Sequence, residues 1–199
     1  MRRRSRRVTP ALPDSNHEAP AEGSRSTSVR ALVLLGVITV LVFVLDQGAK
    51  YLFLKNLDVG EQVPVLGDVL QFHLVKNSGA AFSLLSGSTW IFAIIASLVA
   101  VVIVLFARRI RSLGWATVFG LLLGGTTGNL YDRFFREPSF GLGHVIDYIQ
   151  VYGFRAIFNV ADIGISSAMG LFILLTLRGI GIDGTRTSRR AAATADATE

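Results

Sequence analysis

Four long apolar stretches divide the chain, and polar connections separate them. Residues 88–107 and 112–131 each run for twenty positions without a charge, and residues 31–45 and 163–177 each run for fifteen. A helix needs about 20 mostly apolar residues to cross the hydrocarbon core of a bilayer. None of the four shows the polar face of a helix on the surface of a soluble protein. The pattern therefore predicts an all-α membrane protein with four transmembrane helices.

The connections between these stretches carry a weaker signal. In residues 62–75, Val-rich runs are broken by Pro64 and Gly67, a pattern typical of short strands. We therefore expect a small extracytoplasmic β-rich segment beside the helices. Residues 145–151 alternate loosely between two sets of side chains and are apolar enough to lie in the membrane interface or against the bundle. The predicted membrane domain spans residues 31–178, between tails at 1–30 and 179–199 that are expected to be disordered.

Composition agrees with this class and excludes several others. The chain is 51% hydrophobic and 17% charged, whereas a soluble domain has about 25% charged residues. The absence of cysteine excludes a disulfide scaffold. The three histidines are scattered and no H-E-x-x-H occurs, so we predict neither a metal nor another cofactor.

Basic residues predict the orientation in the membrane. The first tail, the short 107–112 connection and the chain from Arg178 onward together hold 14 of the 20 lysines and arginines. Because cytoplasmic loops carry this excess, both termini are expected in the cytoplasm and the two long connections outside. Trp90 and Trp115 stand near opposite ends of their stretches, as interfacial anchors do. The net charge of +6 thus favours contacts with membrane lipids and does not favour nucleic acid.

The few polar residues of the spans should meet at one depth. Asp46 follows fifteen apolar residues of an outward-running span, and Asp162 precedes fifteen of an inward-running one. Fifteen residues rise about 22 Å, less than the roughly 30 Å core, so both acids should lie a little below the outer surface. Asn129, Asp132 and Arg133 occupy one face at the outer end of the third span.

These acids fall into two groups according to their neighbours. Asp46 has Lys50 one helical turn later and Asp132 is next to Arg133, which favours structural ion pairs. Asp147 and Asp162 have no basic residue nearby in the sequence. Two such carboxylates can share a proton, so that one activates water while the other polarises a carbonyl. Peptide hydrolysis, a proton-coupled transporter and a structural membrane protein all remain open on this reasoning.

Five short segments occur together in an order that resembles a known family. They are residues 46–50, 77–82, 124–133, 145–149 and 158–162. Together they resemble the bacterial lipoprotein signal peptidase (signal peptidase II) family, from about residue 33 to residue 175. The resemblance implies an intramembrane aspartyl endopeptidase of the bacterial cell (inner) membrane. Its substrates would be diacylglyceryl-modified prolipoproteins, cleaved immediately before the lipidated cysteine near the outer face.

The resemblance also implies roles for individual residues. Asp147 and Asp162 correspond to the catalytic pair of the family. Other polar positions match the family's set. Asn77 and Arg133 are implied to contact substrate and lipid, and Asn129 and Asn159 to order the catalytic pair. Asp46, Lys50 and Asp132 are implied to be mainly structural. One departure is Ile163, where the family usually has serine after the second catalytic acid.

Overall fold

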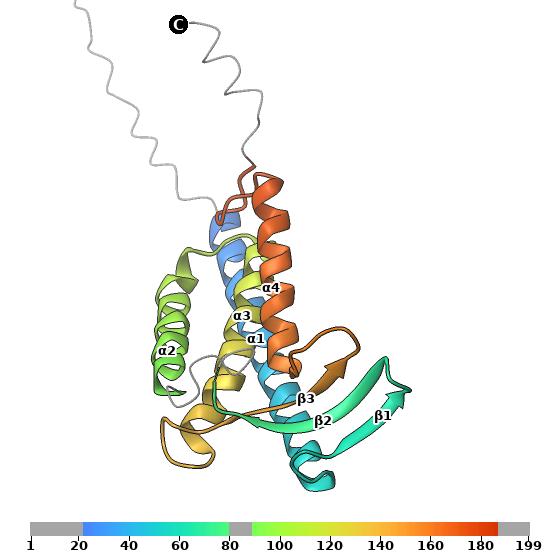
Figure 1. Ribbon diagram of the computed structural model, residues 1–199. Coiled ribbons are helices and arrows are strands. Elements are labelled where there is room, and N and C mark those ends of the chain that lie inside the picture. The colour runs from blue at the N-terminus through green and yellow to red at the C-terminus, as the bar shows by residue number, and fades with distance from the viewer. Residues whose placement is uncertain (1–21, 80–88, 187–199) are drawn as a thin grey trace, which may run out of the picture.

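Helices form a bundle at one end of the molecule, and a three-stranded sheet crosses the other end (Figure 1). The computed structural model describes residues 22–79 and 89–186, and it describes the exposure of side chains from residue 29 onward. The elements in chain order are α1 (Glu22–Asn56), β1 (Gln62–Leu66), β2 (Leu70–Asn77), α2 (Thr89–Phe106), a short 3-10 helix η2 (Ala107–Arg109), α3 (Leu113–Phe135), β3 (Val145–Val151) and α4 (Val160–Leu177).

The helix α3 is packed between α1 and α4 through glycines. A Cβ atom at Gly124 would lie 2.7 Å from the Cβ of Val42 on α1, and one at Gly125 would collide with the carbonyl oxygen of Ala161 on α4. Small residues four apart let helix backbones approach closely in membranes. The glycines of α3 thus bring the polar C-terminal end of this helix against the start of α4.

Three helical segments are long and apolar enough to cross a membrane, namely Val29–Asn56, Thr89–Arg109 and Val160–Leu177. They confirm three of the predicted spans and place the protein among membrane-embedded proteins. The third predicted span is also a helix, the 23-residue α3, but it is not among these segments. The side chains of α3 are more buried than those of the other helices, and its last turns hold Asp132 and Arg133.

The sheet has the order β1-β2-β3, and both pairs are antiparallel. The predicted strand-rich segment is therefore confirmed as the β1–β2 hairpin, and β3 adds a third strand. Buried Leu74, Ile146 and Tyr148 pack the sheet onto the end of α1. There the ring of Tyr148 stacks on Phe53 with 4.0 Å between centroids. This contact fixes the position of β3, and of Asp147 within it, relative to the helices.

The chain after α4 turns back across the opposite end of the bundle. Trp115 Nε1 donates a hydrogen bond of 2.8 Å to the carbonyl of Ile180, and the N–H groups of Arg111 and Ser112 donate to Ile182 at 3.0 Å each. Trp115 is consequently buried, so the expectation that it anchors the membrane interface was wrong, whereas Trp90 is half exposed.

Both tail boundaries differ from those expected from the sequence. The helix α1 begins at Glu22, inside the range assigned to the first tail, and residues 179–186 make the contacts just given. Residues 1–21 and 187–199, the rest of the two predicted tails, lie outside the described residues.

Candidate active site

Asp147 lies on β3, and two amides hold its carboxylate. The side chain is 2% exposed, and it accepts hydrogen bonds from Asn77 Nδ2 at 2.8 Å and from Asn159 Nδ2 at 2.6 Å. Asn77 ends β2, and its own Oδ1 accepts the Gly79 N–H at 2.9 Å, which fixes the direction of the amide. The pKa of Asp147 is raised to about 7, mainly by burial and to a smaller extent by the nearby Asp162, while both amide hydrogen bonds and the charge of Lys50 oppose the increase.

Asp162 lies in the first turn of α4 as part of a capping box. Asn159 Oδ1 accepts the Asp162 N–H at 3.1 Å, while Asp162 Oδ2 accepts the Asn159 N–H at 3.1 Å. This reciprocal pair satisfies two backbone donors at the helix start. The other oxygen, Oδ1, accepts a hydrogen bond of 2.8 Å from Asn129 Nδ2 on α3. Asn159 therefore contacts both acids, Asp147 through its side-chain nitrogen and Asp162 through its oxygen and backbone.

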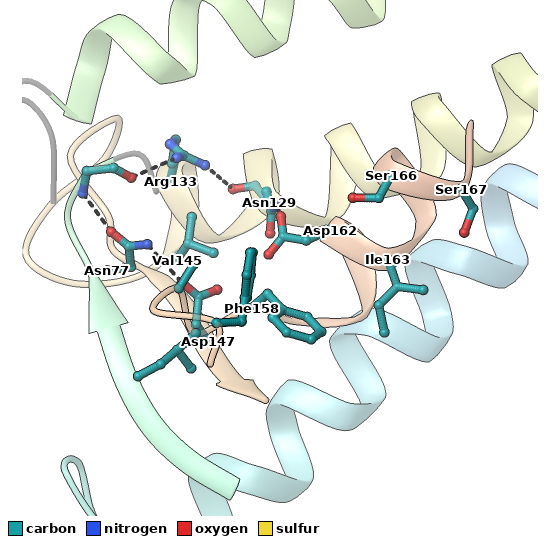
Figure 2. Close-up of a pocket in the computed structure, with 14 residues that line it drawn as sticks. Asn77, Asn129, Arg133, Val145, Asp147, Phe158, Asp162, Ile163, Ser166 and Ser167 are labelled. Atoms are coloured by element: carbon teal, nitrogen blue, oxygen red, sulfur yellow. Dashed lines mark hydrogen bonds between the residues drawn. The ribbon is translucent and has the colours of Figure 1, made fainter. Parts of the chain in front are cut away.

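Both acids line one cavity of about 590 Å³ between β3, the C-terminal half of α3 and the N-terminal half of α4 (Figure 2). Its wall combines polar groups near the acids with apolar and hydroxyl side chains farther along α4. The lining residues are Asn77, Gly79, Asn129, Arg133, Val145, Asp147, Phe154, Ala156, Ile157, Phe158, Asp162, Ile163, Ser166 and Ser167. The volume is in the range of cavities that hold small-molecule or peptide segments.

Arg133 supplies a positive charge to the cavity wall. The side chain is buried and stands over the ring of Phe92, 5.7 Å from its centroid. The guanidinium donates only long hydrogen bonds, to the Asn129 carbonyl at 3.4 Å and to the Gly79 carbonyl at 3.5 Å, and Nε has no partner within the described residues. Buried donors without partners are rare, and the guanidinium of Arg133 therefore has unused hydrogen-bonding capacity at the cavity wall.

A buried network of ion pairs holds the elements and side chains that contact the two acids. Lys50 Nζ lies 2.8 Å from Asp46 and 2.8 Å from Asp132, and none of the three side chains is exposed. Lys50 also donates to Asn129 Oδ1 at 3.0 Å, which directs the amide nitrogen of Asn129 to Asp162. Asp46 accepts the N–H of Ala161 at 2.9 Å, so the network also holds the start of α4.

The ion pairs agree only partly with those expected from the sequence. The pair of Asp46 with Lys50 forms as expected. Asp132 instead pairs with Lys50 and, at 2.6 Å, with Arg136, and not with the adjacent Arg133. Consecutive helix residues point in different directions, whereas Asp132 and Arg136 are four apart and share a face.

All six residues expected at the site line the cavity or bridge the acids, and the three expected to be structural form the network behind them. The sequence analysis missed Gln47, whose Nε2 donates to Asp46 and to the Gly128 carbonyl at 3.0 Å each. It also missed Ser166 on the cavity wall, although Ser166 follows Asp162 by one turn of the helix. That spacing was the available signal.

Sequence comparisons point to one family. A family model described as signal peptidase (SPase) II matches residues 38–178. The chain is 54% identical over 184 residues to the lipoprotein signal peptidase of Leifsonia xyli subsp. xyli (strain CTCB07), covering 90% of this chain and 85% of that protein. It is 41% identical over 175 residues to the lipoprotein signal peptidase of Rhodococcus jostii (strain RHA1), covering 87% and 88%.

Solved structures agree with this result. A bacterial membrane enzyme is similar with a TM-score of 0.65 and 27% identity over 82% of this chain and 95% of that one. A second bacterial membrane enzyme gives 0.62 and 29% over 77% and 94%. The fold is that of a bacterial membrane enzyme. The chain belongs to the signal peptidase II family, which confirms the expectation of a protease that acts on lipoprotein signal peptides.

Proposed function

We propose that Asp147 and Asp162 are the catalytic pair that cleaves prolipoproteins immediately before the lipidated cysteine. The observation that carries this proposal is a contrast among the four carboxylates at and beside the cavity. Asp46 and Asp132 are neutralised by Lys50 within 2.8 Å. Among the described residues no basic side chain forms an ion pair with Asp147 or Asp162, and amides of Asn77, Asn129 and Asn159 hold them at the cavity wall.

The pair is suited to general acid–base hydrolysis. With its pKa raised to about 7 by burial, Asp147 holds a proton near neutral pH and donates it toward the scissile carbonyl oxygen. Asp162 takes a proton from a water molecule, and the water oxygen attacks the carbonyl carbon. When the tetrahedral intermediate collapses, Asp162 protonates the leaving amine and Asp147 recovers its proton. The two acids thus return to their starting states, and no metal or cofactor enters any step.

Neighbouring residues are assigned by the contacts that they make. Arg133 lines the cavity, its terminal nitrogens donate only long hydrogen bonds, and it would bind a carbonyl oxygen of the substrate. Asn129 and Asn159 orient the pair through hydrogen bonds to Asp162 and Asp147. Asn77, for which substrate contact was expected, uses its Nδ2 on Asp147, and we assign it to positioning that acid.

The membrane arrangement follows from charge and packing. We assign α3, the third predicted span, as a transmembrane helix in addition to the other three, because it contacts α1, α2 and α4 and runs between the two ends of the bundle. Arg108, Arg109 and Arg178 gather at the end opposite the sheet, which favours both termini in the cytoplasm. The cavity then lies near the outer face of the bacterial cell membrane. Acyl chains of the diacylglyceryl-cysteine would stay in the outer leaflet, which brings the scissile bond to that level.

The test is cleavage of a purified lipidated prolipoprotein in detergent or in liposomes. Asp147→Asn and Asp162→Asn should each lower the rate by at least about 100-fold, because proton transfer by a positioned side chain contributes that much. Asp68→Asn changes an exposed carboxylate on the β1–β2 turn and should leave the rate unchanged. Thermal unfolding of each variant checks that it is folded. A folded Asp147 or Asp162 variant that cleaves at the normal rate would refute the assignment.

A further inference from the structure

Within the described residues, Ser166 and Ser167 on α4, like Thr126 on α3, lack the hydrogen bond that most serine and threonine hydroxyls of the helices make. Most helical hydroxyls donate to the carbonyl oxygen four residues earlier, at 2.7–3.0 Å, as Thr39, Ser97, Thr117, Thr127 and Thr176 do. In the described part of the chain, neither Ser166 nor Ser167 makes a hydrogen bond with the protein. The usual way of satisfying a hydroxyl inside a membrane helix is therefore not used at these two positions.

Both serines are exposed and line the cavity that holds the two acids. Ser166 follows Asp162 by four residues, so the two share a helix face, and its hydroxyl points along α4 toward Asp162 (Figure 2). Between residues 163 and 175 these serines are the only polar side chains of α4. A hydroxyl without a partner in an apolar setting is costly, which indicates that a ligand supplies the partner.

The part of the substrate that reaches this depth follows from its orientation. The positively charged amino end of a signal peptide stays on the cytoplasmic side, so the residues before the cleaved bond lie inward of the acids. The helix α4 also runs inward, and Ser166 lies about 6 Å deeper than Asp162 at 1.5 Å per residue. An extended peptide advances about 3.3 Å per residue. Ser166 is therefore level with the second residue before the cleaved bond.

We infer that Ser166 binds the substrate backbone there, its hydroxyl donating a hydrogen bond to the carbonyl oxygen of the second residue before the cleaved bond. This inference rests on the proposed catalytic pair. A segment held extended for cleavage has lost its helical hydrogen bonds, and at this depth little water replaces them. A serine hydroxyl supplies the missing donor without adding charge. Ser166 thereby fixes the register of the signal peptide, so that the bond before the cysteine meets the acids.

The experiment combines an enzyme variant with a modified substrate. Ser166→Ala should lower kcat/KM for a lipidated precursor peptide about tenfold, because a buried substrate carbonyl is left without a donor. Ser166→Thr keeps the hydroxyl and should retain most of the activity. Ser97→Ala is the matched control, since that hydroxyl bonds its own helix and should not affect cleavage. Thermal unfolding of Ser166→Ala checks that the fold is intact.

The second arm tests which substrate atom is bound. An ester replaces the amide between the second and first residues before the cleaved bond, which makes the carbonyl of the second residue a weaker acceptor. The wild-type enzyme should cleave this ester analogue several-fold less well, and Ser166→Ala should cleave both peptides equally. The inference would be overturned if Ser166→Ala left kcat/KM unchanged. It would also be overturned if the ester lowered kcat/KM by the same factor in Ser166→Ala as in the wild type. Failure of the proposed catalytic pair gives a different result, because Asp147→Asn or Asp162→Asn would then cleave the unmodified peptide at the normal rate.

Discussion

Replacing Lys50 with methionine should remove much of the stability of the helical bundle. The ammonium group is completely buried and lies 2.8 Å from each of two buried carboxylates, Asp46 and Asp132, and 3.0 Å from Asn129 Oδ1. Methionine has a similar length and fills a similar volume, so the change mainly removes the charge. Asp132 keeps its contact with Arg136, but Asp46 loses its only cationic partner among the described residues.

The size of the effect follows from the burial of the pair. Removing one partner of a buried ion pair costs about 3–5 kcal/mol, because the other charge stays in a medium that solvates it poorly. For a protein of about 200 residues, each kcal/mol lowers the melting temperature by about 2–4 °C. Lys50→Met should therefore lower it by about 6–20 °C. Cleavage should fall as well, because Asn129 loses the contact that directs its amide to Asp162.

The assay is thermal unfolding in detergent, followed by circular dichroism. Lys55→Met, an exposed lysine near the end of the same helix, is the control and should melt like the wild type. Adding Asp46→Asn to Lys50→Met removes the uncompensated charge and should recover at least half of the lost stability. The reasoning is refuted if Lys50→Met and Lys55→Met melt together, or if Asp46→Asn lowers the melting temperature further.

Three further predictions follow from the site and the packing. Cleavage should fall as pH rises through about 7, where Asp147 loses its proton. Asn77→Ala should move this fall to higher pH, because the hydrogen bond from Asn77 lowers the pKa of Asp147. A pH profile that does not move in this variant would contradict the assignment. Since the pKa of Asp147 is raised on folding, its contribution to stability is full below pH about 4 and is lost as pH rises through 7. The difference between melting temperatures at pH 5 and pH 8 should therefore be smaller in Asp147→Asn. Gly125→Ala, whose Cβ would meet the Ala161 carbonyl, should lower the melting temperature by several degrees. Gly36→Ala is the control and should not lower it, because its Cβ meets nothing within 4 Å. Equal melting temperatures of the two variants would show that the helices are loosely packed.

Three of the predicted spans, and the common level of two acids, could be predicted from the sequence because bilayer thickness sets the length of an apolar run. Counting fifteen apolar residues on either side placed Asp46 and Asp162 at one level, and in the structure Asp46 accepts the N–H of Ala161, next to Asp162. Capping of α4 could also be read locally, because Asn159 and Asp162 stand at the spacing of a capping box.

Contacts between distant segments could not be predicted in this way. Asn77 reaches Asp147 only because β2 pairs with β3 in a register that opposes Asn77 to Val145, and no local pattern fixes that register. Lys50 was assigned to Asp46 from their spacing, but its contacts with Asp132 and Asn129 depend on the packing of α1 against α3. Burial of Trp115 likewise depends on the chain returning after α4 to present the Ile180 carbonyl.

Asn159, which bridges the two acids, links the proposed site to the order in which the chain is made. Asp147 and Asp162 lie late in the chain, and the contacts of Asn159 with both acids require α4 to be packed against the rest of the bundle. A nascent chain that ends before α4 carries Asp147 without Asp162. On the proposed assignment, such a chain cannot cleave, so activity requires that the last helix has been made and has packed against the others.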